Sequence, residues 1–476
     1  MSTLSPSDLT QYIGSLWRAP ILGLLKHYTK IPNKSPVFDP EWKENGHMDD
    51  AVRLLTDSIR SFDIVGLRYD VLEVDGRTPL IFIEVEAYKS GTGNVLLYGH
   101  FDKQPEFTGW HEGKGPWTPV LEDGRLYGRG AGDDGYAIFS CLSALAGLQE
   151  QGCAHPRCTI VIEGCEESGS PDLPFYMQVL SPRIQVPDVV FCLDAECGNY
   201  DQLWLTTSLR GMVSGTLRVE VLKEGVHSGA AGGIVPSSFR VLRDVLERIE
   251  NSGDGDLVDS LHVSIPDWVD TQSNEVAAVL GDTIVQRYPW ASPKHYDHAD
   301  LASMVTANTW YPCFEVVGLG GAPEPQVAGN TLRPNTDAKL VFRLPPAANH
   351  ARVQSFVKKE LERDPPNGTK ITFDCDVGES GWFSKPVQSW LDTALNEASE
   401  LYFGQPYKRM GTGGTIPFMK MLADQFPACQ FVVTGVMGPH SNAHGPNEFL
   451  DLETAERVTC CVAHVLHSMG SGDHIN

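Results

Sequence analysis

Long apolar segments are absent from this sequence of 476 residues. No stretch approaches the ~18 consecutive apolar residues that a membrane-spanning helix needs, so we expect no membrane partner. The N-terminal segment MSTLSPSDLTQYIG also lacks the basic stretch and apolar run that are typical of a signal peptide. These two absences predict a soluble, cytoplasmic protein.

Basic residues are scarce beside acidic ones. The chain has 37 Lys and Arg against 61 Asp and Glu, which makes the formal net charge −24. Because binding to nucleic-acid phosphates needs a surplus of Lys and Arg, this balance predicts no nucleic-acid partner. It is compatible with an enzyme in which some carboxylates hold cations.

Closely spaced cysteine pairs are also missing. The 11 cysteines are scattered along the chain, and none forms a CxxC pair. Cys460 and Cys461 are adjacent, but they lie in an apolar run with helical spacing. This usage predicts buried, reduced thiols in an intracellular protein.

The length and the hydrophobic pattern predict an α/β fold built from two domains. NVLLYGH, CTIVIEG and DVVFCLD are short, continuous apolar runs, which are typical of strands buried on both faces of an α/β sheet. Helical patterns precede and separate these runs, and further strand and helix patterns follow after about residue 379. We therefore expect a discontinuous catalytic α/β domain made of residues 1–208 and 379–476.

Residues 209–378 differ in their hydrophobic pattern from the segments on either side. MVSGTLRVEVL, NTDAKLVFRLP and TKITFDCDV alternate like strands, and two amphipathic helices are expected between them. Strand, helix, strand, helix, strand is the order of a small open α+β sandwich. We interpret this segment as an inserted domain, and we expect residues 252–310 within it to be irregular.

The segment GHFD follows the predicted strand VLLYG. Because residues i and i+2 of an extended chain lie on the same side, Asp102 is placed to orient the ring of His100 as a metal ligand. Taken alone, this pattern is as well explained by a polar strand end without a function.

The glycine-rich segment GRGAGDDG precedes a predicted helix and contains Asp133. The simplest interpretation of Asp133 is a helix N-cap, a position that Asp favours. A phosphate-binding loop is a poorer interpretation, because the Lys-Ser/Thr ending is missing and adjacent aspartates repel phosphate.

Adjacent carboxylates follow another buried strand. Glu166 and Glu167 come after CTIVIEG, and their mutual repulsion suggests a compensating cation, although a solvated loop is an equal alternative. Asp194 follows the strand of FCLDAE, and a His of PHSNAHGPNE, either His440 or His444, follows QFVVTGV.

Together these residues predict a metal site, because sites in open α/β sheets form beyond the carboxyl ends of the strands. Two His and three carboxylates suit two divalent ions with one bridging carboxylate. Zinc is the expected metal, with manganese or cobalt as alternatives. No G-x-S-x-G motif supports a serine hydrolase. The residues alone do not separate His440 from His444, or Glu166 from Glu167.

These motifs, in this order, resemble those of the M20 family of metallopeptidases. YGHFD, LYGRGAGDDG, IEGCEESGS, FCLDAE and AHGPNE match its motifs, and RGMVSGTLRVE, VHSG and GGTIP also fall in family order. The resemblance spans about residues 17–468, and the long inserted segment places the chain nearest the branch that includes the cytosolic and carnosine dipeptidases.

The resemblance implies a role for each candidate. It implies that Glu166 is the general base and that Asp102 orients His100. It implies an inserted lid or dimerisation domain, a homodimer, and a His227 that reaches the partner's active site. The implied metal ligands are the bridging Asp133, with His100 and Asp194 on one ion and Glu167 and His444 on the other; the implied substrate-binding residues are Arg343, Thr331 and Thr415.

The predicted function is therefore two-metal hydrolysis of the amide bond in dipeptides or similar short substrates with a free carboxylate. Several residues depart from the dipeptidase pattern: Gly135, Arg333, Gly411 and Thr412. The last three lie in expected substrate-recognition segments, so a deacylase or deamidase of N-acyl or modified amino acids is the alternative. A catalytically silent binding homologue is disfavoured, because all five ligands and the base are present.

Overall fold

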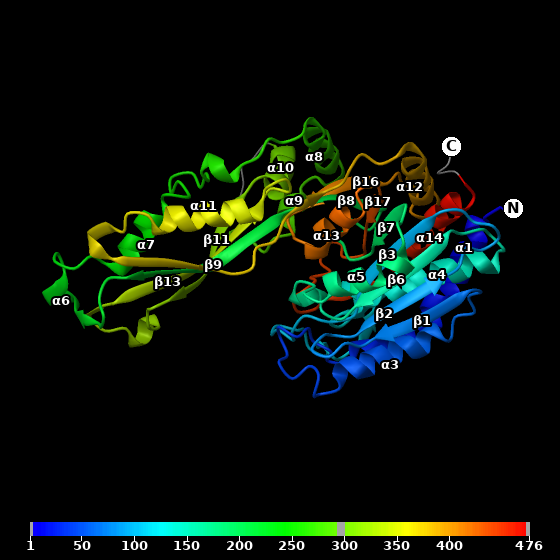
Figure 1. The fold of residues 1–476 in the computed structure, drawn as a ribbon, viewed down its shortest axis with the longest axis horizontal. Coiled ribbons are helices and arrows are strands. Elements are labelled where there is room, and N and C mark those ends of the chain that lie inside the picture. The colour runs from blue at the N-terminus through cyan, green and yellow to red at the C-terminus, as the bar shows by residue number, and fades with distance from the viewer. Residues whose placement is uncertain (1–2, 293–299, 473–476) are drawn as a thin grey trace.

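The computed structural model describes residues 3–292 and 300–472, which form two lobes joined at the middle of the molecule (Figure 1). One lobe contains both ends of the described chain and a six-stranded sheet, and the other contains a four-stranded sheet. This mixed α/β architecture confirms the predicted fold class. The exact domain boundaries at 208/209 and 378/379 stay a prediction.

The six-stranded sheet has the order β1-β2-β6-β3-β7-β17. The β6, β3, β7 and β17 strands are mutually parallel, whereas β1 and β2 run antiparallel to their neighbours. The four parallel strands therefore end at the same edge of the sheet. The strands are β1 (Leu67–Leu72), β2 (Leu80–Val85), β3 (Asn94–His100), β6 (Arg157–Glu163), β7 (Val189–Cys192) and β17 (Gln430–Val433).

Helices cover both faces of this sheet, as the continuous apolar strands predict. Leu97 packs into the core on one face, and its neighbours Leu96 and Tyr98 pack into the core on the other. The first face carries α1 (Pro6–Leu16), α3 (His47–Ile59), α4 (Ala137–Glu150), α12 (Ser389–Tyr402) and α14 (Leu452–Gly470), and the second carries α5 (Leu173–Ile184) and α13 (Pro417–Gln425). No helix of the described chain is long and apolar enough to cross a bilayer.

The four-stranded sheet of the other lobe is antiparallel, with the order β11-β13-β9-β14. The three predicted strands are β9 (Gly211–Glu220), β13 (Asn335–Leu344) and β14 (Lys370–Cys375), with α7 (Ser238–Leu246) and α11 (His350–Glu362) packed on one face. The edge strand β11 (Cys313–Gly320) was not predicted. A two-stranded ribbon of β10 (Val226–His227) and β12 (Thr331–Leu332) lies near α6 (Ser228–Ala231) at the far tip (Figure 1).

The prediction that residues 252–310 are irregular was wrong for most of this segment. It forms α8 (Asp267–Leu280), α9 (Thr283–Gln286) and α10 (Leu301–Trp310), while residues 293–299 lie outside the described part. Val276 and Val305 pack with Trp204 and Met410 in a small core of their own. These helices thus cover a three-stranded sheet of β15 (Trp382–Phe383), β8 (Trp204–Leu209) and β16 (Lys408–Thr412).

The remaining elements are short or lie at the periphery of the first lobe. A sheet of β4 (Val120–Glu122), β5 (Arg125–Tyr127) and β18 (Phe449–Asp451) brings the segment after residue 448 beside the glycine-rich segment after Tyr127. The N-terminal region continues after α1 through a π-helical turn, Trp17–Ile21, into α2 (Leu22–Thr29).

Candidate metal centre and active site

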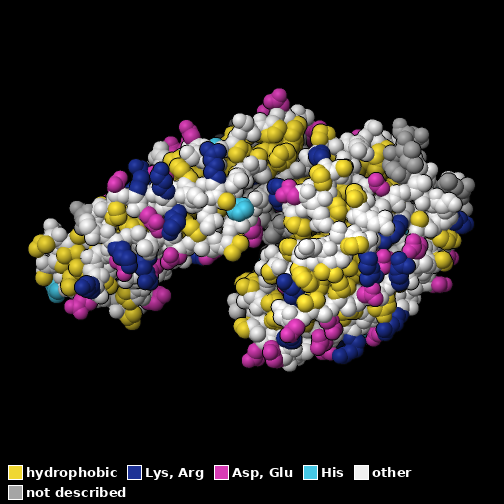
Figure 2. All heavy atoms as spheres, viewed as in Figure 1, with side chains coloured by type: hydrophobic (Ala, Val, Ile, Leu, Met, Phe, Trp, Pro, Cys, Tyr) yellow, Lys and Arg dark blue, Asp and Glu magenta, His cyan; other side chains and the backbone are white. Residues whose placement is uncertain are grey.

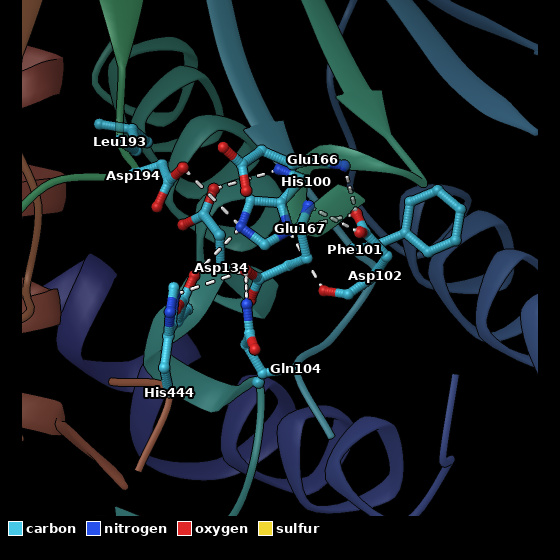
Figure 3. Close-up of polar contacts among 12 residues, drawn as sticks. His100, Phe101, Asp102, Gln104, Asp134, Glu166, Glu167, Leu193, Asp194 and His444 are labelled. Atoms are coloured by element: carbon cyan, nitrogen blue, oxygen red, sulfur yellow. Dashed lines mark hydrogen bonds and ion pairs between the residues drawn. The ribbon is translucent and has the colours of Figure 1, made fainter. Parts of the chain in front are cut away.

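Three of the predicted ligands follow adjacent parallel strands of the large sheet. His100 is the last residue of β3, Glu167 lies in the turn Glu166–Ser168 after β6, and Asp194 follows β7 by two residues. Figure 3 shows that the side chains of His100, Glu167, Asp194 and His444 converge. The carboxyl edge of one sheet therefore gathers them, as the strand pattern predicts.

Asp133 reaches the same place from a different kind of element. It lies in the π-helical turn Ala131–Gly135, directly before α4, and a cis peptide bond joins it to Asp134. The simpler interpretation as an N-cap is wrong, because Tyr136 is the N-cap residue of α4 and no side chain caps this helix. The Asp133 carboxylate is buried and is directed toward the two histidines instead.

One group of potential metal ligands consists of His100, Asp133 and Asp194. Nε2 of His100 lies 3.1 Å from Oδ1 of Asp133 and 3.8 Å from Oδ2 of Asp194. All three residues are buried, and their donor atoms lie within 4.8 Å of one another. One small ion fits among these three donors.

A second group consists of Asp133, Glu167 and His444. Nε2 of His444 lies 3.0 Å from Oδ2 of Asp133 and 3.4 Å from Oε2 of Glu167. Asp133 thus directs one carboxylate oxygen at each histidine and belongs to both groups. His440 belongs to neither group among the described residues, so the geometry separates it from His444.

Burial and mutual repulsion shift the pKa values of these carboxyls. The pKa is raised to about 6 for Asp194 and to about 8 for Glu167, mainly because both carboxyls are desolvated, and the nearby charge of Asp133 contributes to both shifts. For His444, whose side chain is 56% exposed, desolvation lowers the pKa, but the hydrogen bond with Asp133 and the charges of Asp133 and Glu167 together outweigh it and raise the pKa to about 10. In the absence of a metal ion, the positive charge of protonated histidines therefore compensates the negative charge of the carboxylates. A divalent metal ion would displace these protons and supply the positive charge instead.

Glu166 lies beside these groups without belonging to either. Its backbone N–H and that of Glu167 donate to the two carboxylate oxygens of Asp102, each over 3.0 Å. Its carboxylate accepts no hydrogen bond from the residues that the structure describes, and burial together with the charge of Asp194 raises its pKa well above the usual range. Glu166 is therefore a carboxyl group free to exchange a proton.

Asp102 holds the neighbouring loop as well as the histidine. Its Oδ1 lies 3.4 Å from Nδ1 of His100, and its backbone carbonyl lies 3.2 Å from the same nitrogen. Because the same carboxylate accepts from Glu166 and Glu167, Asp102 links the His100 ring to the loop that carries both glutamates. The sequence pattern predicted only the contact with the ring.

Two further contacts around the ligands were missed by the sequence reasoning. The side-chain amide of Gln104 donates to Oε2 of Glu167 over 2.5 Å. Arg129 forms an ion pair with Glu448, whose other oxygen accepts from the N–H of Gly130 over 2.8 Å. Arg129 lies in the motif LYGRGAGDDG and Glu448 in the motif AHGPNE. No spacing or pattern in the sequence indicates that these two residues contact each other.

The Arg129–Glu448 pair anchors the loop that carries His444. Arg129 also donates to the carbonyl of Gly445 over 2.8 Å, and both charged side chains are buried. Several non-glycine residues of this loop have left-handed backbone conformations, which cost energy and need support from outside. They are His440, Asn442, His444 and Asn447.

We expect Glu448→Gln to lower the free energy of unfolding of the metal-free protein by about 3 kcal/mol, because it leaves Arg129 buried without an anionic partner. Urea unfolding in the presence of chelator measures this loss. The double variant with Arg129→Met should recover part of it, because both charges are then removed. A single variant as stable as the parent would contradict the anchoring role.

The predicted substrate-binding residues separate into two places. Nη1 of Arg343 donates to Oγ1 of Thr415 over 3.1 Å, close to the junction of the lobes. His227 and Thr331 face each other in the β10–β12 ribbon, at the tip opposite the large sheet (Figure 1). The structure therefore brings Arg343 and Thr415 together, and it does not bring His227 or Thr331 to the metal ligands of the same chain.

Two departures from the dipeptidase pattern have steric reasons. A β-carbon on Gly135 would lie 2.2 Å from the ring of Tyr28, and one on Gly411 would lie 2.4 Å from Oγ of Ser208 and 2.9 Å from Cβ of Thr309. Since Thr309 belongs to α10, this helix occupies space next to β16 that a larger side chain at position 411 would need.

Comparisons with known proteins agree with this geometry. The sequence is 27% identical to a cysteinylglycine-S-conjugate dipeptidase of Corynebacterium striatum, over 94% of either chain. It is 24% identical to the human Beta-Ala-His dipeptidase, over 70% of this chain and 66% of the relative. The solved structure of the di-peptidase Dug1p from Saccharomyces cerevisiae has the same fold, with a TM-score of 0.79 and 20% identity over 98% of this chain and 99% of that one. The profile of peptidase family M20/M25/M40 matches residues 96–468, so the chain belongs to this family of metallopeptidases.

Proposed function

We propose that the protein hydrolyses the amide bond of dipeptides, or of similarly short substrates with a free carboxylate, with two zinc ions. The observation that carries this proposal is the position of Asp133 between two donor groups, one oxygen toward each histidine. The dipeptidase names of the two relatives support the choice of substrate class.

The residues present suit two divalent ions. We assign His100 and Asp194 to one ion, Glu167 and His444 to the other, and Asp133 to both. Each group combines one imidazole with two carboxylates, which suits zinc and also permits manganese or cobalt. When bound, the two divalent metal ions supply Lewis-acid chemistry and lower the pKa of a nearby water toward neutrality.

We assign the role of general base to Glu166. Its carboxylate accepts no hydrogen bond from the described residues and has a raised pKa, so it is suited to accept a proton from the attacking water and to return it to the leaving amine. Asp102 keeps Glu166 in place through the backbone N–H groups of the loop. The base therefore sits on a segment that is tied to a metal ligand.

Arg343 is assigned to the substrate carboxylate, and Thr415 orients its guanidinium. A guanidinium matches a carboxylate with two parallel hydrogen bonds, which favours short substrates whose free carboxylate ends near the scissile bond. The hollow between the two lobes, visible in Figure 2, gives such substrates a route to the junction.

His227 and Thr331 are assigned to the active site of a partner subunit in a homodimer, with His227 stabilising the oxyanion. Their distance from the metal ligands of their own chain supports this arrangement. The edge strand β11 also exposes apolar side chains, Val316, Val317 and Leu319, as an association surface would. We also propose a cytoplasmic location, because nine of the cysteines are buried free thiols, as is common in a reducing compartment.

Hydrolysis of N-acyl or otherwise modified amino acids is the second candidate. The segment from Gly411 to Thr415 contains no carboxylate, whereas close dipeptidase relatives have Arg and Glu at positions 411 and 412. Without an acidic residue there, this segment offers no counter-ion for a free substrate ammonium. The metal chemistry would be the same for either substrate class.

A panel of dipeptides and matched N-acetyl amino acids distinguishes the two candidates. We expect dipeptides to be cleaved at least tenfold faster, activity to disappear with chelator, and zinc to restore it. Faster cleavage of the acetylated series would favour the second candidate, and activity unaffected by exhaustive chelation would overturn the metal mechanism. Sedimentation of the same sample tests the dimer.

A further inference from the structure

Arg210 is a buried arginine that lies close to the half-buried Arg343. It precedes β9 and follows β8, where the two lobes join, and only 7% of its surface is exposed. Among residues 3–292 and 300–472, no carboxylate lies within 4.0 Å of the guanidinium of either arginine, although acidic residues outnumber basic ones in the chain. A buried cation without a counter-ion is costly, so the missing anion needs an explanation.

Arg210 holds the segment that orients Arg343. Its backbone N–H donates to the carbonyl of Gly414 over 3.0 Å, and its Nε donates to the carbonyl of Gly413 over 3.1 Å. Its own carbonyl accepts from Oγ1 of Thr415 over 2.6 Å, and that hydroxyl accepts from Arg343. The two arginines are therefore linked through one hydrogen-bonded segment.

The Arg210 guanidinium is only partly used by these contacts. Nη1 contacts the carbonyl of Tyr311 at 3.5 Å and the sulfur of Cys313 at 3.2 Å, whereas Nη2 donates to no residue that the structure describes. All of its side-chain partners are uncharged, so its positive charge is not neutralised. Nη2 therefore remains available to an anion, next to Gly413 of the segment that orients Arg343.

The surrounding charges are consistent with a cationic site at these two arginines. Burial lowers the pKa of Arg343, and the charge of Arg210 lowers it further, which shows that the two cations interact. Cys313 and Glu379 act on Arg343 in the opposite direction and raise its pKa, and Glu379 is the carboxyl among them; burial raises the pKa of Glu379 and Arg343 lowers it. Oε1 of Glu379 lies 3.4 Å from the place of a β-carbon on Gly169, in the loop after Glu167, so the pocket borders the metal-ligand loop.

We propose that Arg210 and Arg343 form a two-cation pocket that selects substrates with an acidic carboxyl-terminal residue. Arg343 binds the main-chain carboxylate, and Arg210 binds the side-chain carboxylate of an aspartyl or glutamyl residue. This inference rests on the proposed function, because it names the substrate class of the same site. The burial of Arg210 and the partial burial of Arg343 strengthen these charge-assisted bonds.

The test compares substrates that differ only in one charge. Pairs ending in Asp or Asn, and in Glu or Gln, are measured as dipeptides and as N-acetyl amino acids. We expect kcat/KM to be about tenfold higher for the acidic member, mainly through KM, because one charge-assisted hydrogen bond is added. Arg210→Met should reduce the ratio to about one, and Arg210→Lys should retain part of it.

Arg218→Met is the matched control, because Arg218 is an exposed arginine of β9 that pairs with Asp337. It should leave the ratio unchanged. A parent enzyme without preference for the acidic member, or a preference that survives Arg210→Met, would overturn the inference. If the Arg210→Met variant does not fold, the ratio of kcat/KM values measured for the parent enzyme and for Arg210→Lys still tests the inference. A parent that cleaves neither series of substrates would instead contradict the proposed function.

Discussion

Glu166→Gln is expected to lower kcat about a thousandfold while both metal ions remain bound. The carboxylate of Glu166 has no protein partner among the described residues, and it belongs to neither donor group. An amide at this position cannot take a proton from water, but it leaves the ligand shell intact. Steady-state kinetics and metal analysis of the same preparation measure both quantities.

A matched exposed glutamate serves as the control for this experiment. Glu196 follows Asp194 by two residues, and its side chain is 47% exposed, so Glu196→Gln should retain normal activity. A Glu166→Gln enzyme with full activity would contradict the assignment of the base. A variant that is inactive because it has lost its metal would show that Glu166 is a ligand instead.

Asp133→Asn is expected to remove both metal ions, whereas Asp194→Asn or His444→Ala should remove only one. Asp133 is the single residue that belongs to both donor groups, one oxygen facing each histidine. Asparagine is also neutral, so the substitution removes the one negative charge that belongs to both donor groups. We expect activity to fall below one thousandth of that of the parent.

Metal stoichiometry after dialysis against buffered zinc separates these cases. Asp134→Asn is a demanding control, because Asp134 is adjacent and equally buried but lies outside both groups. Its carboxylate accepts the N–H of His100 over 3.2 Å, a contact that an amide oxygen can keep, so two ions should remain bound. Loss of only one ion from Asp133→Asn would contradict the bridging assignment.

Much of the fold follows from local patterns in the sequence. The continuous apolar runs that became β3, β6 and β7 are buried on both faces, which is why they show no alternation. The helices over residues 267–310 were missed for the opposite reason. Their apolar residues, such as Val276 and Val305, pack on Trp204 and Met410 from distant parts of the chain, and no local pattern reveals that partner surface.

The edge strand β11 shows a second kind of limit. An edge strand is paired on one side only, and β11 has no buried residue, so its apolar residues do not have to alternate cleanly. Its pairing with β13 also contains a register shift between Val316 and Gly318. The strand is recognisable only once β13 is present beside it.

Sequence by itself determined the set of residues available for a metal site, because polar residues that follow parallel buried strands must meet at one edge of the sheet. The tertiary structure decided which of them share an ion. Asp133 comes from a glycine-rich turn, not from a strand end, and only the folded chain places it between His100 and His444. The buried contacts of Arg129 with Glu448, and of Arg210 with the segment around Thr415, join residues more than two hundred positions apart. Such distances are set by packing, and no spacing along the chain encodes them.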